Sequence, residues 1–318
     1  MTRKILLDLR RIDNTACTQK CNKNLRKEYT DQDICKKTKS ALDGLPVRCV
    51  GAWAHDKIYR LAQYFGIFAT GMKDKWSHNL NYIEICSGPG RCIIRDKGEE
   101  LDGTALAIIN HACFGQIQHA IFIDNSTKVV DILNKRIKAL QKDSIARAVK
   151  GDYVTEDVKN ILQTLPKNCL NLVFIDPTDC SVPFYVIEEL KANLNRFDLI
   201  LNIAIGTDVI RNIRLAVLNP RYQKVRNKYI KFLGSSDYFD NALVKRYAQQ
   251  NNSIELKRAF IAAYESNLKK LGLGYTDVVK VKHYYYLLFA SGNPIGINFW
   301  KKANRIDPTR QRTFVFTQ

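Results

Sequence analysis

The sequence lacks the features that mark several large classes of protein. No apolar run among its 318 residues approaches the roughly 18 to 20 that a membrane-spanning helix needs. The short apolar stretch at the start is interrupted by Asp8, so we expect no secretory leader. Internal repeats and low-complexity tracts are also absent. These absences exclude an integral membrane protein and a fibrous architecture. Without export signals, the nine cysteines predict reduced thiols in a cytoplasmic protein.

The motifs of several enzyme and metal-binding classes are missing too. No Ser-His-Asp arrangement, H-E-x-x-H pattern or phosphate loop is recognisable, so hydrolase and kinase activities have no residues to support them. The first fifty residues contain Cys17, Cys21, Cys35 and Cys49, but no C-x-x-C knuckle. This spacing favours ordinary thiols over structural zinc, and we predict no metal site.

What the sequence has in excess is positive charge. Fifty Lys and Arg residues against 31 Asp and Glu give a net charge of +19. Because each neutralised phosphate releases counterions, such an excess favours a polyanionic partner, nucleic acid above all. A solvated basic surface is the alternative. The hydrophobic fraction of 46% is sufficient for a sizeable core.

The chain divides by pattern into four segments. Residues 1–50 form a basic, cysteine-containing extension with little periodicity. Residues 51–210 alternate short apolar strands with amphipathic helices, and residues 211–281 form a basic helical insert. Residues 282–318 are expected to return to the sheet and complete it. Repeated strand–helix–strand units with apolar strands predict an α/β, Rossmann-like fold around a mostly parallel sheet.

The expected elements follow from apolar periodicity and from turn and capping residues. Helices are predicted at 53–71, 103–114, 127–141, 154–165 and 184–193. Strands are predicted at 81–86, 119–124, 146–150, 171–176, 196–202, 283–291 and 312–317.

The insert interleaves basic and aromatic side chains. Such a pattern suits phosphate contact combined with base stacking. The same aromatic residues can instead form the core of the insert while its lysines face water. Both interpretations stay open, for Tyr222, Tyr229, Phe232, Tyr238, Phe239, Tyr247, Phe260 and Tyr264.

A glycine-containing turn follows the first predicted strand of the alternating region. The segment from Glu84 to Gly90 reads Glu-Ile-Cys-Ser-Gly-Pro-Gly, and its glycines let the chain turn tightly beneath a ligand. A dinucleotide site would require a third glycine at position 93, where Ile93 stands. We therefore expect a ligand without phosphate, and S-adenosylmethionine fits. Its predicted contacts include Glu84, Ser87, Gly88 and Gly90.

Acidic residues follow the next three strands. Asp124 is placed to accept the ribose hydroxyls, although an interaction with a helix N-terminus explains it as well. Asp152 can accept the adenine amine or serve as a turn residue. Asp176 faces the expected position of the methyl sulfonium, which makes it both a cofactor contact and a catalytic candidate.

The segment Asp176-Pro-Thr-Asp179 resembles the [DN]-P-P-[FYW] motif of amino-methyltransferases, in which the first side chain holds the target nitrogen. Thr178 replaces the second proline, and Asp179 replaces the aromatic residue. The aromatic platform for a flipped base is therefore missing, which argues against the adenine amino group as the target.

Taken in order, ten motifs resemble the three-Cys-motif partner family of bacterial and phage-associated proteins, over about residues 43–318. They are Asp43-Gly-Leu-Pro46, Val50-Gly-Ala-Trp53, Lys57, Tyr64-Phe65, Tyr82–Gly90, Asp102-Gly-Thr-Ala-Leu106, Phe122-Ile-Asp124, Gly151-Asp152, Phe174-Ile-Asp-Pro177 and Leu287–Pro294.

The resemblance implies a class I S-adenosylmethionine-dependent methyltransferase fold with seven strands and the cofactor glycines at Gly88 and Gly90. It also implies a three-Cys-motif protein as partner and places Trp53 and Lys57 at the rim of the site. Lys57 would anchor a phosphate or orient an acceptor oxygen, unless it is a solvated lysine. Asn293 stands where the family often has histidine.

Two functions follow from these observations. The first is a methyltransferase that acts on nucleic acid or on a macromolecular partner, with Asp176 and Lys57 as catalytic candidates. The second is a non-catalytic adaptor on a methyltransferase-like fold that binds nucleic acid or a partner enzyme. The altered Asp176–Asp179 segment motivates the second function.

Overall fold

The computed structural model describes residues 11–14, 30–31, 34–95, 97–282 and 284–305. The chain forms two compact units, which we treat separately. The first consists of Met1–Gly151 together with Phe299–Gln318, and the second of Asp152–Asn298. No helix among the described residues is long and apolar enough to cross a membrane.

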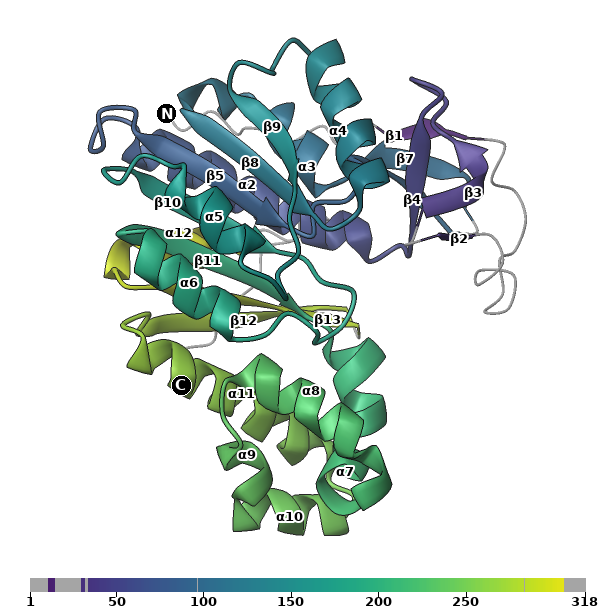
Figure 1. Ribbon diagram of the computed structural model, residues 1–318, viewed down its shortest axis with the longest axis vertical. Helices are drawn as coiled ribbons and strands as arrows, with labels where there is room; N and C mark the ends of the chain where they lie inside the picture. Colours follow the sequence, from purple (N-terminus) through teal and green to yellow (C-terminus); the bar gives the residue numbers. More distant parts are fainter. Residues whose placement is uncertain (1–10, 15–29, 32–33, 96, 283, 306–318) are drawn as a thin grey trace. The chain divides into compact units, whose positions relative to one another are not determined.

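The larger sheet has seven strands in the order β12-β13-β11-β10-β5-β8-β9 (Figure 1). Strands β5, β8 and β9 pair in parallel, as do β10 and β11, whereas β13 is antiparallel to both β11 and β12. The predicted Rossmann-like fold with a mostly parallel seven-stranded sheet is therefore confirmed. The strands are β5 (Leu80–Ile85), β8 (His119–Asp124), β9 (Ala146–Lys150), β10 (Leu170–Ile175), β11 (Arg196–Ile203), β12 (Tyr275–Val281) and β13 (Tyr285–Ser291).

Two of the three helices predicted before residue 151 begin and end close to their expected positions. Helix α2 (Ala54–Met72) buries one apolar face, which includes Leu61 and Phe65. Helix α4 (Thr127–Ala139) begins where the Ser126 hydroxyl accepts a hydrogen bond from the backbone N–H of Val129, as the capping pattern predicts. Helix α3 (Thr104–Ile109) is shorter than predicted, and the short 3-10 helix η1 (Phe114–Gln116) follows it.

A second sheet, which the sequence did not predict, has six strands in the order β1-β7-β6-β4-β3-β2. The chain leaves the glycine turn, forms β6 and β7, and only then enters α3. Strand β4 pairs in parallel with β6, so residues before position 51 belong to the same sheet as the hairpin. The strands are β1 (Arg11–Asp13), β2 (Thr30–Asp31), β3 (Ile34–Lys39), β4 (Pro46–Val50), β6 (Arg91–Ile94) and β7 (Glu99–Asp102).

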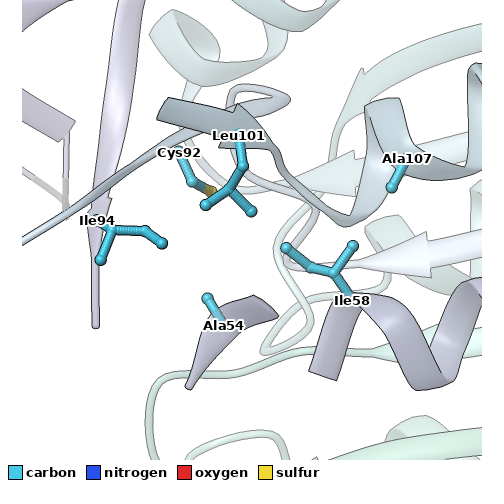
Figure 2. Close-up of a cluster of buried hydrophobic side chains, with 6 residues drawn as sticks. All are labelled: Ala54, Ile58, Cys92, Ile94, Leu101 and Ala107. Atoms are coloured by element: carbon cyan, nitrogen blue, oxygen red, sulfur yellow. The ribbon is translucent and has the colours of Figure 1, made fainter. Parts of the chain in front are cut away.

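A cluster of buried apolar side chains joins the second sheet to the helices of the first unit. Figure 2 shows side chains from α2, β6, β7 and α3 that converge on one another. Burial of such side chains contributes roughly 1.5 to 3 kcal/mol for each large aliphatic residue. The hairpin is therefore part of the core. The residues are Ala54, Ile58, Cys92, Ile94, Leu101 and Ala107.

The second unit contains the predicted helical insert. Six of its eight interleaved aromatic residues are buried, and they contact one another through stacked, tilted and edge-on rings. For these six, the core interpretation is confirmed, namely for Tyr229, Phe232, Tyr238, Phe239, Phe260 and Tyr264.

The helices of the second unit lie before and within this insert (Figure 1). Helices α5 and α6 accompany the parallel strands, and the π-helix η2 leads from β11 into the insert. Their bounds are α5 (Asp157–Gln163), α6 (Tyr185–Asn193), η2 (Ile205–Val209), α7 (Ile210–Leu218), η3 (Pro220–Tyr222), α8 (Gln223–Leu233), α9 (Asp237–Asp240), α10 (Ala242–Gln249) and α11 (Ser253–Lys270).

The last two strands of the seven-stranded sheet, in chain order, differ from the expectation in one case. The strand predicted at 283–291 is present as β13, but its partner β12 comes from the last residues of the segment 211–281, which was expected to be helical. Gly272 and Gly274 separate β12 from α11, and its β-branched residues favour a strand. The strand predicted at 312–317 lies outside the described residues, and α12 (Pro294–Ala303) follows β13.

Candidate functional site

The glycine turn after β5 has an unusual backbone. Cys86, Gly88 and Gly90 have φ angles of 66°, 67° and 94°, so every second residue lies in the left-handed region. A Cβ on Gly90 would lie 2.9 Å from Cδ1 of Leu133 and 3.0 Å from Cγ of Leu106. Position 90 therefore requires glycine for its conformation and for its packing.

Cys86 is the third residue of this alternation, and the sequence analysis gave it no role. The alternation runs upstream from Gly90 through Gly88 to Cys86, two residues after Glu84. A non-glycine residue with positive φ is uncommon and costs roughly 1 to 2 kcal/mol. The spacing of the acidic residue and the two glycines was the signal that could have identified this position.

Replacing Cys86 with glycine is expected to leave the free energy of unfolding unchanged or to raise it by up to about 1 kcal/mol, because glycine adopts positive φ without strain. Cys86→Val is expected to lower it by about 1 to 2 kcal/mol, since a β-branched side chain disfavours this conformation. Urea denaturation measures both changes. Cys49→Gly on strand β4 is the control, and it should destabilise. Equal stability of the Val and Gly variants at position 86 would contradict the assignment.

The turn is bound to the end of the neighbouring strand β8. The backbone N–H of Gly88 donates to Oδ2 of Asp124 over 3.0 Å, and the N–H of Ser126 donates to Oδ1 over 3.1 Å. The N–H of Ser87 donates to the carbonyl of Ile123 over 3.1 Å. These bonds bring three predicted cofactor residues together, namely Ser87, Gly88 and Asp124.

Two polar groups at the turn retain bonding capacity. The Ser87 hydroxyl is buried and has no hydrogen-bond partner among the described residues. The Asp124 carboxylate is half-buried, and each of its oxygens accepts one N–H, although a carboxylate offers about four lone-pair positions. The Asp124 carboxylate can thus accept hydrogen bonds from a ligand, and the Ser87 hydroxyl can bond to a polar group of a ligand.

Glu84 lies on β5 and is fully buried. Its carboxylate accepts hydrogen bonds from the Tyr82 hydroxyl over 2.8 Å and from the Thr104 hydroxyl. Thr104 begins α3, and the N–H of the preceding Gly103 donates to the carbonyl of Gly90 over 2.7 Å. Glu84 therefore anchors α3 beside the turn, and a direct contact with a cofactor stays a prediction.

Arg136 on α4 is a residue of the site that the sequence analysis missed. Its Nη1 donates to the carbonyl of Pro89 over 2.6 Å, and its Nε donates to Asp43 over 2.7 Å. Burial raises the pKa of Asp43, but the hydrogen bond and charge of Arg136, together with the bonds from Leu45 and Ser40, outweigh this effect, so the pKa lies below its usual value. Arg136 thereby connects the glycine turn to the β3–β4 turn. The signal that could have indicated this contact was Asp43, which begins the first motif of the family resemblance.

The two residues expected at the rim of the site lie at the start of α2. Trp53 precedes the helix, and its ring lies under the guanidinium of Arg95, with 5.9 Å between Cζ and the ring centroid. Lys57 follows in the first turn and is half-buried. Its catalytic role stays a prediction.

In the second unit, Asp176 comes directly after β10 and is buried. Its Oδ1 accepts a hydrogen bond of 2.8 Å from Nδ2 of Asn202 on β11. The Oδ1 atom of Asn202 is buried without a hydrogen-bond partner among the described residues. Asn202 thus orients Asp176 and keeps one buried acceptor available for a further hydrogen bond.

Asp179, where the related motif has an aromatic residue, is paired with a lysine of the insert. Lys228 Nζ lies 3.2 Å from Asp179 and 2.6 Å from Asp208 of the π-helix. Asp208 also accepts from the backbone N–H of Cys180 and from the Tyr229 hydroxyl. This network fixes the end of the Asp176–Asp179 segment, and no local sequence signal marks Asp208 as its centre.

The pH dependence of stability is expected to include a contribution from Asp208. Burial raises its pKa, but the hydrogen bonds from Lys228, Cys180 and Tyr229, together with the charge of Lys228, outweigh this effect, so the pKa lies below the usual value of 3.8. The stabilisation is therefore present above the unfolded pKa, near 3.8, and is lost as the pH falls through the folded pKa.

The free energy of unfolding of the Asp208→Asn variant should depend less steeply on pH than that of the wild type, below about pH 4. Denaturation series at several pH values measure this slope. Asp237→Asn on the exposed surface of α9 should keep the wild-type slope. Identical slopes for Asp208→Asn and the wild type would contradict the pairing.

Asp152 begins the second unit as a turn residue. Its Oδ1 accepts from the backbone N–H of Val154 over 2.9 Å, and its own N–H donates to Asp157 over 3.1 Å. These contacts are those of a turn residue. A hydrogen bond from the adenine amine to Asp152 stays a prediction.

The cysteines of the described residues offer no metal site. No cluster of three or more His, Cys, Asp or Glu residues suited to a metal ion occurs in the described part of the chain. Cys35 and Cys49 are half-buried thiols beside Val47 and Ile93 on the smaller sheet. Cys17 and Cys21 lie outside the described residues.

Comparisons with known proteins give only distant likenesses. No family model matches the sequence, and no curated protein matches it. An O-methyltransferase from Bacillus cereus in complex with SAH has a TM-score of 0.38 and 12% identity, over 76% of this chain and 82% of that chain. A SAM-dependent methyltransferase from Aquifex aeolicus has a TM-score of 0.36 and 14% identity, over 70% and 88%.

M. capricolum TrmK in complex with S-adenosyl-homocysteine has a TM-score of 0.34 and 12% identity, over 70% of this chain and 67% of that chain. With TM-scores below 0.5, these likenesses add no argument. The fold assignment rests on the strand order and the strand directions of this chain.

Proposed function

We propose that this chain is an S-adenosylmethionine-dependent methyltransferase that acts on nucleic acid or on a macromolecular partner. One observation carries the proposal: the hydrogen bond from the Gly88 N–H to Asp124 joins the glycine turn to the acid at the end of the adjacent parallel strand. In open α/β sheets, ligands bind beyond the carboxyl ends of the strands. The residues of the turn therefore meet where a ligand is expected.

The donor set fits the proposed cofactor. The remaining lone pairs of the half-buried Asp124 carboxylate suit ribose hydroxyls, and the unsatisfied hydroxyl of Ser87 suits a polar group of the amino-acid end. Gly88, with its positive φ and no Cβ, lets a ligand approach the backbone. A phosphate-binding turn that leads straight into a helix is absent here, because β6 and β7 follow Gly90.

When bound, S-adenosylmethionine supplies a methyl group on an electrophilic sulfonium. Asp124 holds the ribose, and Asp176 accepts a hydrogen bond from an N–H of the acceptor, with its orientation fixed by Asn202. Holding both reactants in position supplies most of the rate gain in such a displacement. Lys57 is proposed to anchor a phosphate or an acceptor oxygen near the site.

The surface of the helical insert supports a polyanionic acceptor. Residues 211–282 contain 15 Lys and Arg against 5 Asp and Glu. Because six of its aromatic residues are buried, the insert is proposed to bind phosphate rather than to stack bases through those six. The exposed cations in this range are Arg211, Arg214, Arg221, Lys224, Lys231, Lys245, Arg246, Arg258, Lys269, Lys270, Lys280 and Lys282.

Membership of the three-Cys-motif partner family, and a three-Cys-motif protein as the partner, are part of the same proposal. Their support is the order of motifs from Asp43 to Pro294. The bonds between Asp43 and Arg136 give the first of these motifs a role at the glycine turn.

The test combines binding and transfer. Calorimetric titration should show binding of S-adenosylmethionine, and tritium from labelled donor should appear in total RNA, DNA or protein. The fraction that acquires tritium identifies the class of acceptor. Absence of cofactor binding would overturn the proposed function.

A non-catalytic adaptor on the same fold is the second candidate. The pairing of Asp179 with Lys228 favours it, because the aromatic platform of related motifs is replaced by an ion pair. Retained nucleic-acid binding without methyl transfer and without cofactor binding would support the adaptor. A steep dependence of binding on salt is expected for both functions and does not distinguish them.

A further inference from the structure

Arg48 of the smaller sheet lies over the glycine turn. A Cβ placed on Gly88 would lie 3.3 Å from Nη1 and 3.5 Å from Cδ of Arg48. The guanidinium therefore occupies the space that a side chain at position 88 would take. The sequence analysis assigned Arg48 to an extension outside the core and gave it no role.

The register of the strands fixes the direction of this side chain. Arg48 on β4 pairs with Cys92 on β6 in the parallel register, so both side chains lie on the same face of the sheet. Cys92 belongs to the buried cluster in Figure 2, which packs against α2 and α3. The neighbouring Val47 and Ile93 are fully buried in a cluster on the opposite face. Because successive side chains of a strand alternate between the two faces, Arg48 lies on the face opposite to that of Val47.

The chemistry of this position suits a carboxylate. A guanidinium is always charged and presents five N–H donors in a fork that matches a carboxylate in bidentate geometry. The buried Ser87 hydroxyl next to Gly88 offers one more donor without a partner among the described residues.

We infer that Arg48 binds the α-carboxylate of the methionyl part of S-adenosylmethionine, with the Ser87 hydroxyl as a second donor. The inference rests on the proposed function and adds a residue from the smaller sheet to its cofactor site. Because the contact concerns only the amino-acid end, it should not influence binding of the nucleoside end.

The experiment compares two ligands that differ at this end. S-adenosylhomocysteine carries the carboxylate, and 5′-methylthioadenosine lacks the whole amino-acid part. Isothermal titration of the full chain measures both dissociation constants for the wild type, Arg48→Gln and Arg48→Lys. Lys36→Gln on β3 is the matched control, because it removes one exposed positive charge from the same sheet.

Loss of a charge-assisted bidentate contact should weaken S-adenosylhomocysteine binding by Arg48→Gln about 10- to 30-fold. Arg48→Lys should show a smaller loss, because lysine keeps the charge and loses the fork. Binding of 5′-methylthioadenosine should be unchanged in both variants, and Lys36→Gln should bind both ligands like the wild type. If Arg48→Gln does not fold, the Arg48→Lys variant still tests the inference. Its dissociation constant should then rise for S-adenosylhomocysteine and stay unchanged for 5′-methylthioadenosine.

Three results would overturn the inference. Unchanged affinity for S-adenosylhomocysteine, or an equal loss for both ligands, would show that Arg48 does not contact the carboxylate. A gain in affinity would show that the guanidinium blocks the turn. Failure of the wild type to bind either ligand would overturn the proposed function itself.

Discussion

The Asp124→Ala variant is expected to bind S-adenosylmethionine about 100-fold more weakly than the wild type, or more weakly still. The substitution removes the proposed contacts to the ribose, and each hydrogen bond to a charged group contributes about 1.5 to 3 kcal/mol. It also removes the acceptor of the Gly88 and Ser126 N–H groups. Isothermal titration measures the affinity, and tritium transfer should fall with it.

Two further variants distinguish a loss of cofactor contacts from a loss of the hydrogen bonds that hold the glycine turn. Asp124→Asn keeps a side-chain oxygen for one backbone N–H but loses the charge, and we expect it to bind between the wild type and Asp124→Ala. Asp131→Ala on the exposed face of α4 is the control and should bind like the wild type. Wild-type affinity in Asp124→Ala would contradict the assignment of the cofactor site.

The Glu100→Ala variant is expected to lose about 3 to 5 kcal/mol of stability, since it removes one partner of a buried ion pair and leaves several buried donors without their acceptor. Glu100 is fully buried on β7 and pairs with Arg91, which also lies 2.6 Å from Asp102. Its carboxylate accepts further bonds from Asn14, from the Ser40 hydroxyl and from the backbone N–H of Ala41.

Glu100 is expected to be ionised in the folded protein. Burial raises its pKa, but the hydrogen bonds from Ser40, Arg91, Ala41 and Asn14 together outweigh burial, so the pKa lies below its usual value. Urea denaturation measures the loss of stability in Glu100→Ala. The adjacent Glu99→Ala, at a half-buried position, should change the free energy of unfolding by less than about 1 kcal/mol. Similar stabilities of the two variants would contradict the structural role of Glu100.

The central sheet was predictable because its strands are apolar throughout. Strand β5 is buried at all six positions, and such runs between amphipathic helices distinguish a parallel sheet from a solvated one. Capping residues placed the start of α4 in the same way. The local pattern of apolar residues was sufficient to predict an element wherever that element buries a whole face.

The smaller sheet could not be predicted, because its pairing depends on residues distant in sequence. Strand β4 is followed in space by β6, and the β3–β4 pair shifts register between Ile34 and Lys39. The polar network around Glu100 likewise joins residues up to 86 positions apart. Such contacts leave no periodic signal in either segment alone.

In the candidate site, the residues of the glycine turn could be predicted from the sequence. The residues from other elements that contact the turn could not. Spacing after a strand indicated Ser87, Gly88 and Asp124, which the structure joins by hydrogen bonds. Arg48 and Arg136 reach the turn from other elements, and nothing in their own neighbourhoods distinguishes them from surface cations.

The hairpin of β6 and β7 has a practical consequence for dissecting the protein. A fragment that starts at residue 51, where the sequence pattern changes, would remove β4 and leave β6 with an open hydrogen-bonding edge. Such an edge readily pairs with other molecules, so the fragment should aggregate instead of reporting on the glycine turn. Deletion mapping of this protein therefore has to keep the early strands, even where only the glycine turn is of interest.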